Sequence, residues 1–165
     1  MEKLWSPWRS QYIESFKDKK PECGCVFCNA KEANIDDDSS LVIEKGKYTF
    51  TVLNLYPYNN GHLMVVPNRH VNDPGLLTME ENAEVMEKLN LAMKSLKIAI
   101  NPEGFNLGAN IGKVGGAGID QHIHFHIVPR WNGDTNFMPV IGEVKILSQD
   151  LLMTKKALLK AYKEL

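Results

Sequence analysis

Three of the five histidines in this 165-residue chain occupy alternate positions in one short run, Gln121-His122-Ile123-His124-Phe125-His126-Ile127-Val128. Large apolar residues fill the positions between them and after them. Successive side chains of a β-strand point to opposite faces, so a strand here places His122, His124 and His126 on one face. The apolar face must belong to the core, and the histidine face must therefore look outward or into a cleft.

The histidine face indicates chemistry rather than packing. A single histidine on a strand is usually a surface residue or a hydrogen-bonded core residue, but three in strict alternation are difficult to explain as filler. Next-but-one residues of a strand lie roughly 6.5–7 Å apart, so the imidazoles can contact successive parts of one ligand. Two functions remain open: a metal site, or nucleophilic catalysis by a neutral imidazole beside histidines that hold an anionic substrate.

A glycine-rich segment, Gly112 to Gly118, leads into the histidine run. Exposed backbone N–H groups in such segments commonly bind phosphate oxygens. Alone, a glycine-rich loop is a weak signal and often only a flexible turn. Together with three histidines on one face, it indicates phosphoryl or nucleotidyl chemistry.

The three cysteines, Cys23, Cys25 and Cys28, fall within six residues. An odd number argues against a disulfide framework in an apparently intracellular chain. Cys25 and Cys28 form a Cys-x-x-Cys pair, which suits a zinc knuckle or a redox site. A redox pair usually begins a helix that follows a strand, but here a polar run and Pro21 come first. Zinc is favoured, although the pair supplies only two of four ligands.

The composition fits one soluble globular domain. Lys plus Arg number 19 and Asp plus Glu number 20, so the chain has neither a basic nucleic-acid-binding character nor an acidic tail. No apolar run approaches the roughly 18–20 residues of a membrane span. The opening residues lack the apolar core of a signal peptide. We therefore expect a cytoplasmic protein whose partners include neither nucleic acid nor membrane.

The apolar pattern predicts short strands interrupted by one long helix. The expected strands are 41–44, 48–53, 62–67, 105–110 and 122–128, with 140–147 as a further extended candidate. Thr78 and Glu81 have the spacing of a helix capping box, apolar residues then recur at helical period to Ile100, and Asn101-Pro102 ends the run. Ser148 is the expected cap of a last helix. The pattern indicates an α+β fold with a mainly antiparallel sheet.

The histidine run has the pattern His-apolar-His-apolar-His-apolar-apolar, and through it the chain resembles the histidine triad (HIT) superfamily. The segment from Asn54 to Pro67 is similar to the one that precedes the triad in that family. Trp5-Ser6-Pro7-Trp8-Arg9, Pro129-Arg130-Trp131 and residues 133–137 make the chain most similar to the diadenosine tetraphosphate phosphorylase branch. The likeness extends over nearly the whole chain.

The resemblance implies one HIT-like domain over residues 1–165, α+β, with a mainly antiparallel sheet, one long helix and a C-terminal helix. Residues 1–30 would form an N-terminal arm with the cysteine-containing knuckle, and 138–165 a C-terminal extension. Proteins of this shape usually form homodimers through the long helix and an adjoining strand. The helix has apolar residues on more than one side, which is consistent with burial on two faces: Ala83, Val85, Met86, Leu89, Leu91 and Met93.

The resemblance also implies the reaction. His124 would be the nucleophile that attacks the α-phosphorus of a nucleotide, His126 would contact the phosphate and share charge as the leaving group departs, and His62 would support the triad. The chain would be a nucleotidyltransferase or hydrolase acting on dinucleoside polyphosphates. Inorganic phosphate would receive the nucleotidyl group in a phosphorylase, and water in a hydrolase of dinucleoside polyphosphates or nucleoside phosphoramidates. A nucleotide-binding regulatory protein with little turnover is a further alternative.

Six residues would contact the substrate by the same resemblance. Asn54 stands where many relatives have an acidic residue that binds ribose hydroxyls, and Asn110 matches a phosphate-contacting asparagine. Trp131 would stack on a base or line a second nucleotide site, or else serve packing. The remaining contacts are backbone N–H groups of the glycine-rich segment, at Gly115, Gly116 and Gly118. Relatives often carry serine or threonine in place of Gly118, so this position argues mildly against phosphate as acceptor.

Some family members bind structural zinc, and the matching positions here are Cys25, Cys28, His70 and His122. They make the closed four-ligand set that is typical of structural zinc. No redox or organic cofactor is expected. Cys23 is left over, as a free thiol or as a replacement for one of its neighbours.

Overall fold

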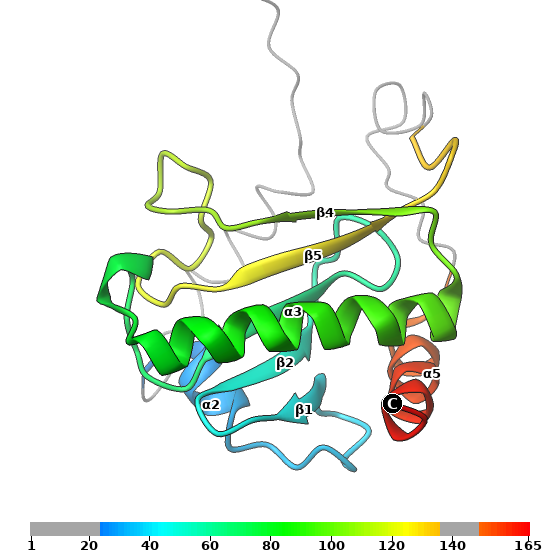
Figure 1. Ribbon diagram of the computed structural model, residues 1–165, viewed down its shortest axis with the longest axis horizontal. Helices are drawn as coiled ribbons and strands as arrows, with labels where there is room; N and C mark the ends of the chain where they lie inside the picture. Colours follow the sequence, from blue (N-terminus) through cyan, green and yellow to red (C-terminus); the bar gives the residue numbers. More distant parts are fainter. Residues whose placement is uncertain (1–23, 136–148) are drawn as a thin grey trace, which may run out of the picture.

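The architecture was obtained from a computed structural model, which describes residues 24–135 and 149–165. A five-stranded sheet forms its centre, in the order β1-β2-β3-β5-β4, with every neighbouring pair antiparallel (Figure 1). The strands are β1 (Val42–Lys45), β2 (Thr49–Leu53), β3 (Leu63–Pro67), β4 (Gly104–Gly108) and β5 (Phe125–Arg130). The predicted α+β class with an antiparallel sheet is confirmed.

The helices cover both faces of this sheet. The long helix α3 (Met79–Ile100) crosses one face, and α5 (Leu151–Lys163) packs beside its C-terminal half (Figure 1). The short helix α2 (Val26–Ala30) covers the other face, and a 3-10 turn, η1 (Pro74–Leu76), precedes α3. None of the helices within the described ranges combines the length and the apolar character that a membrane crossing needs.

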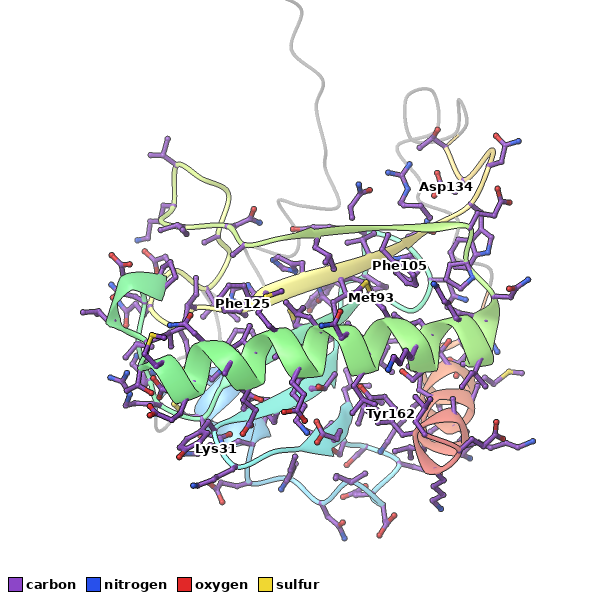
Figure 2. The ribbon with its side chains drawn as sticks, in the orientation of Figure 1. Lys31, Met93, Phe105, Phe125, Asp134 and Tyr162 are labelled. Atoms are coloured by element: carbon purple, nitrogen blue, oxygen red, sulfur yellow. The ribbon has the colours of Figure 1, made fainter. Side chains whose placement is uncertain are left out.

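The core therefore has two parts, one on each face of the sheet. Side chains from α3, α5 and one face of the strands form the first part, which Met93 and Phe105 extend at its margin (Figure 2). Phe27 of α2 packs on the opposite face against a second set: Val42, Phe50, Val52, Met64 and Val66. Because β2 and β3 are covered on both faces, all ten of their residues are buried.

The predicted boundaries of the long helix are confirmed. Thr78 accepts a hydrogen bond from the backbone N–H of Glu81, and the Glu81 carboxylate accepts one from the N–H of Thr78, which completes the capping box. Asn101 ends the helix in the left-handed conformation, with φ of 46°, and Pro102 follows. Local sequence signals specify both ends of this element.

Two predicted element starts are wrong by more than one residue. The histidine strand does not extend back to His122 but begins at Phe125, because the main chain before it bonds outside the sheet. There the N–H of Ile123 donates to the carbonyl of Val71, 2.6 Å away. The last helix is capped by Asp150, whose carboxylate accepts from two backbone N–H groups, and not by Ser148. The expected extended segment at 140–147, the aromatic arm before Gly24 and the thiol of Cys23 lie outside the described residues.

An ion pair fixes the end of β5 to the turn between β2 and β3. Asp134 accepts two hydrogen bonds from the Arg130 guanidinium, at 2.6 and 2.9 Å, and lies at the outer end of the strand (Figure 2). Asn59 of the turn donates to both Asp134 and the carbonyl of Pro129. The Arg130 guanidinium holds the pKa of the Asp134 carboxyl down to about 2. This arrangement positions the turn that leads into His62.

Candidate active site and metal cluster

A cavity of about 630 Å³ is bounded by α2, the sheet and the glycine-rich segment. Its apolar walls come mainly from α2, β2 and β3: Val26, Phe27, Leu41, Val52, Met64 and Ile119. Its polar groups come from the turn after β2, the glycine-rich segment and the histidine run: Asn54, Asn110, Lys113, His124 and His126. This size and mixed lining are typical of a small-molecule site.

The proton of His124 is held on one ring nitrogen. Its Nδ1 lies 2.8 Å from the main-chain oxygen of His122, and since a carbonyl oxygen only accepts, Nδ1 must be the donor. In the neutral ring the other nitrogen, Nε2, then has a free lone pair. Burial lowers the pKa of His124, which favours this neutral form. His124 therefore has the protonation state of a nucleophile.

His62 and His126 form a hydrogen-bonded pair with the opposite arrangement. The Nδ1 of His62 accepts from the backbone N–H of Tyr58, at 3.0 Å, and also faces the amide nitrogen of Asn54, at 3.3 Å. The proton of neutral His62 must therefore be on Nε2, which donates to Nδ1 of His126 over 2.9 Å. His126 in turn carries its own proton on Nε2.

The Nε2 atom of His126 is a donor without a partner. It is buried and has no hydrogen-bond acceptor among the described residues. Burial, and secondarily the neighbouring His124, lower the pKa of His126 to about 4, so the ring is neutral at pH 7. An unsatisfied buried N–H beside a cavity is costly unless a ligand accepts from it. The site therefore presents a hydrogen-bond donor next to a nucleophilic lone pair.

Two aromatic residues, which the sequence analysis did not single out, keep these imidazoles in place. The ring of Phe27 lies 4.8 Å from that of His124, and the ring of Tyr58 lies 4.6 Å from that of His62. Phe27 stands inside the Cys-x-x-Cys pair, and Tyr58 in the turn before His62. Phe27 has no sequence signal of its own, because it acts through a contact with His124, far along the chain. Tyr58 packs on His62 four residues later and also lies 5.6 Å from the ring of His126, a contact that only the fold makes.

The glycine-rich segment is a closed turn rather than an open row of donors. The N–H groups of Gly115 and Gly116 donate to the carbonyls of Gly112 and Lys113, at 3.1 and 3.0 Å. A Cβ atom at Gly115 would collide with the carbonyl oxygen of Ile111, which explains the glycine there. Gly116 and Gly118 line the cavity, whereas Gly115 does not. None of these turn bonds uses the N–H of Gly118.

Trp131 lies apart from the cavity within the described chain. Its indole N–H donates to the carbonyl of Asn101, 3.1 Å away, at the C-terminal end of α3. It is not among the residues that line the cavity. The structure of the single chain therefore gives this tryptophan a place beside the long helix, and its role as a base-stacking residue stays a prediction.

The four predicted metal ligands converge at one point. Sγ of Cys25 and of Cys28 lie 3.3 and 3.7 Å from Nδ1 of His122, and Sγ of Cys28 lies 3.3 Å from Nδ1 of His70. All four ligand atoms lie within 4.8 Å of one another. Two atoms that bind one zinc ion at about 2.0–2.3 Å can be at most about 4.6 Å apart, so the cluster fits zinc with a small contraction.

The protonation states of the cluster also suit a cation. His122 donates from Nε2 to the carbonyl of Pro67, over 2.8 Å, which leaves the lone pair on the Nδ1 that faces the cysteines. The two thiols are free rather than joined in a disulfide. Burial raises the pKa of Cys28 because it disfavours the charged thiolate, and the neighbouring Cys25 raises it further through charge repulsion. These four residues could hold a metal ion.

Comparison with known proteins establishes the family. The sequence model of the HIT domain family matches residues 35–133 of this chain, so the chain belongs to the HIT family. It is 38% identical over 161 residues to an AP-4-A phosphorylase of Mycobacterium tuberculosis. That alignment covers 96% of this chain and 83% of the relative. It is also 28% identical over 108 residues to an adenosine 5'-monophosphoramidase of Schizosaccharomyces pombe, covering 66% and 75% of the two chains.

A solved structure supports the fold. The crystal structure of a Zn-bound histidine triad family protein from Mycobacterium smegmatis matches with a TM-score of 0.68 and 24% identity, covering 86% of this chain and 94% of that one. The predicted HIT-like fold is thus confirmed. The named relatives are enzymes, so the prediction that the chain is a HIT-family enzyme is confirmed as well.

The proton positions of the histidines can be measured. We expect His126 to remain neutral, with its proton on Nε2, down to about pH 4, because burial opposes its charge. The ordinary pKa of a histidine is about 6.5, so on acidification the unfolded chain binds a second proton on this ring at a higher pH than the folded protein does. The free energy of unfolding therefore falls as the pH drops from about 6.5 to 4. Long-range ¹H–¹⁵N NMR of the imidazoles reports the tautomer directly.

The variant His62→Ala is the control for this measurement. It removes the donor to Nδ1 of His126, and we expect both tautomers of His126 to be populated. A charged His126 at pH 6 in the unaltered protein, or a proton on its Nδ1, would contradict the assignment.

Proposed function

We propose that the protein is a nucleotidyltransferase that cleaves dinucleoside polyphosphates, diadenosine tetraphosphate in the first place, through a covalent nucleotidyl-histidine. One observation carries this proposal: the lone pair of His124 and the unpaired N–H of His126 belong to rings that line the same cavity. The apolar walls suit a nucleobase, and the polar groups suit phosphate. The likeness to an AP-4-A phosphorylase supports the choice of substrate.

In the first step, Nε2 of His124 attacks the α-phosphorus, a P–N bond forms, and the bond to the bridging oxygen breaks. The ring becomes positive, and its Nδ1–H bond to the carbonyl of His122 stabilises that charge. The leaving polyphosphate departs as an anion and needs no proton. The neutral His126 therefore acts as a hydrogen-bond donor to the phosphate oxygens rather than as an acid.

In the second step, an acceptor oxygen attacks the phosphorus of the nucleotidyl-histidine and the P–N bond breaks, which restores neutral His124. With inorganic phosphate as acceptor, diadenosine tetraphosphate gives ADP and ATP, whereas water gives AMP and ATP. His62 holds the tautomer of His126 through both steps, because its Nδ1 is committed to the N–H of Tyr58. Asn54, Asn110, Gly116 and Gly118, which line the cavity, are the proposed substrate contacts.

A hydrolase and a regulatory protein that binds nucleotide with little turnover remain the alternatives. Phosphorolysis is favoured by the phosphorylase likeness over nearly the whole chain, and hydrolysis by the missing hydroxyl at Gly118. A catalytic zinc held by the triad is disfavoured by the geometry. Only His122 of the three faces the cysteines, while His124 and His126 direct Nδ1 to other partners.

The nucleophile is tested by removing it. We expect His124→Ala to lower the turnover of diadenosine tetraphosphate about 10³-fold or more, because no other group supplies the attacking lone pair. Chelation should lower turnover far less than His124→Ala does, because no metal ion takes part in the chemical step. Turnover is followed by chromatography of the products, and trapping of labelled nucleotidyl-protein in acid reports the intermediate. Unchanged turnover in His124→Ala would falsify the mechanism.

The acceptor is tested by product identity. Loss of one hydrogen bond to a charged group costs roughly 1.5–3 kcal/mol, yet the backbone N–H of Gly118, which none of the turn bonds uses, can still donate to an incoming phosphate. We therefore expect ADP whose formation depends on added phosphate. The Gly118→Ser variant, which restores a hydroxyl, should raise the phosphate-dependent rate relative to the rate with water. AMP formed equally with and without phosphate would identify a hydrolase.

We infer that the cluster of Cys25, Cys28, His70 and His122 binds structural zinc. Cys25→Ser should reduce zinc from near one ion per chain and lower the melting temperature by roughly 5–10 °C, with residual activity retained. Metal analysis and calorimetry provide the measurement. Protein that takes up no zinc even after reconstitution would show that the ligand assignment is wrong.

We further infer a homodimer. Among the described strands, β4 is the last at one edge of the sheet (Figure 1), and α3 exposes large apolar side chains, with Met79 81% and Met86 57% exposed. We expect light scattering at micromolar concentration to give a dimer mass, and Met86→Glu to shift it toward monomer. Lys160→Glu on the exposed side of α5 is the matched control. A monomer mass for the unaltered protein contradicts the inference.

A further inference from the structure

The short helix α2 belongs to the metal cluster and to the cavity at the same time. Cys25 is its N-cap residue and Cys28 lies within it. The residues beside these cysteines line the cavity: Val26, Phe27 and Ala30. The ligands of the metal cluster and one apolar wall of the cavity therefore share a single turn of helix.

The helix α2 is short and depends on its contacts with the rest of the fold. It has five residues, and no side chain caps its N-terminus. Isolated helices of this length are not stable, so the position of α2 depends on tertiary contacts. Phe27, which is 5% exposed, is its buried anchor in the core. The thiols, which point to His70 and His122, form a second attachment of α2 to the rest of the fold.

His122 links the same cluster to the nucleophile. Its ring faces the cysteines through Nδ1 and donates to Pro67 through Nε2. Its carbonyl oxygen accepts the hydrogen bond that holds the proton of His124 on Nδ1. The position of this one residue therefore determines both a metal ligand and the orientation of the nucleophile.

We propose that metal binding and nucleotide binding are coupled: a metal ion at Cys25, Cys28, His70 and His122 orders α2 and His122, and so raises the affinity of the cavity for nucleotide. Phe27 and His122 act as the positioning residues between the two sites. This inference rests on the proposed function, since it requires that the cavity binds nucleotide.

The physical reason is a shared ordering cost. Without a cation the two thiols gain nothing from approaching each other, so α2 can leave its place and the cavity loses a wall. A nucleotide that binds the metal-free protein must order that wall itself, whereas in the metal-bound protein the wall is already in place. Coupling of this kind is reciprocal, so nucleotide must raise metal affinity by the same factor.

The experiment measures affinities rather than turnover. AMP is titrated calorimetrically into the full chain loaded with zinc and into the same protein stripped by chelator. Zinc affinity is measured by competition with a chromophoric chelator, with and without AMP. We expect AMP to bind about tenfold more weakly to the stripped protein, and zinc affinity to rise by the same factor with AMP. Equal AMP affinity in the two forms overturns the proposal.

The variant His70→Ala tests the coupling without touching the cavity, because His70 is exposed and is not a lining residue. It should bind AMP weakly at low zinc and recover the full affinity at saturating zinc. Asn72→Ala, exposed in the same loop, is the matched control and should behave as the unaltered protein. AMP affinity in His70→Ala that is independent of zinc contradicts the proposal.

The variant Phe27→Leu tests the route. It keeps an apolar wall but loses the aromatic contact with His124. We expect the coupling factor to fall toward one while zinc is still bound. An unchanged factor overturns the role of Phe27. Failure of AMP to bind in either form contradicts the proposed function itself, whereas AMP bound equally with and without zinc contradicts only the coupling.

Discussion

The hydrogen bond from Nδ1 of His124 to the main-chain oxygen of His122 is the interaction on which the site depends. It decides which nitrogen of His124, the proposed nucleophile, carries the proton and which presents a lone pair to the cavity. The bond exists because the chain leaves the regular strand before Phe125, so the carbonyl of His122 is not used by the sheet. A strand that continued back to His122 would turn this carbonyl toward a neighbouring strand. The irregular segment is therefore a requirement of the proposed chemistry.

The second half of the site depends on a chain of acceptors and donors that begins at the backbone. The N–H of Tyr58 fixes the tautomer of His62, and His62 fixes that of His126. This chain of hydrogen bonds needs no charged imidazole. Burial also disfavours the charged form, and for this reason the pKa of His126 is low. A buried neutral pair can orient a donor toward an anionic substrate without adding a positive charge that would bind substrate and transition state alike. Asn59 donates a hydrogen bond to Asp134, and this bond holds the turn that carries Tyr58.

The metal cluster and the cavity lie on the two sides of the same short segments. Cys25 and Cys28 flank residues that line the cavity, and His122 precedes the nucleophile by two positions. A metal ion held by all four residues would have no open position for substrate, and this supports the inferred structural role of the cluster. Such an arrangement transmits ordering from one site to the other because α2 is too short to be stable by itself.

The sequence by itself determined the class of the fold, both ends of the long helix, the identity of the triad and the four residues of the metal cluster. The helix ends, the triad and the Cys25–Cys28 pair are local patterns in period, capping residues and spacing. The ligands His70 and His122 came only from the resemblance to the HIT family, because they lie far from the cysteines in the sequence. Only the tertiary structure decided the proton positions of His62, His124 and His126. It also decided the closed turn of the glycine-rich segment, the place of Trp131 away from the cavity and the contact of Phe27 with His124. Each of these depends on which main-chain carbonyl, N–H group or ring lies within about 3–5 Å, and such partners come from segments that are distant in sequence or free of the regular pattern. The sequence shows which residue types are available to the site, but their protonation and orientation follow only from the folded structure.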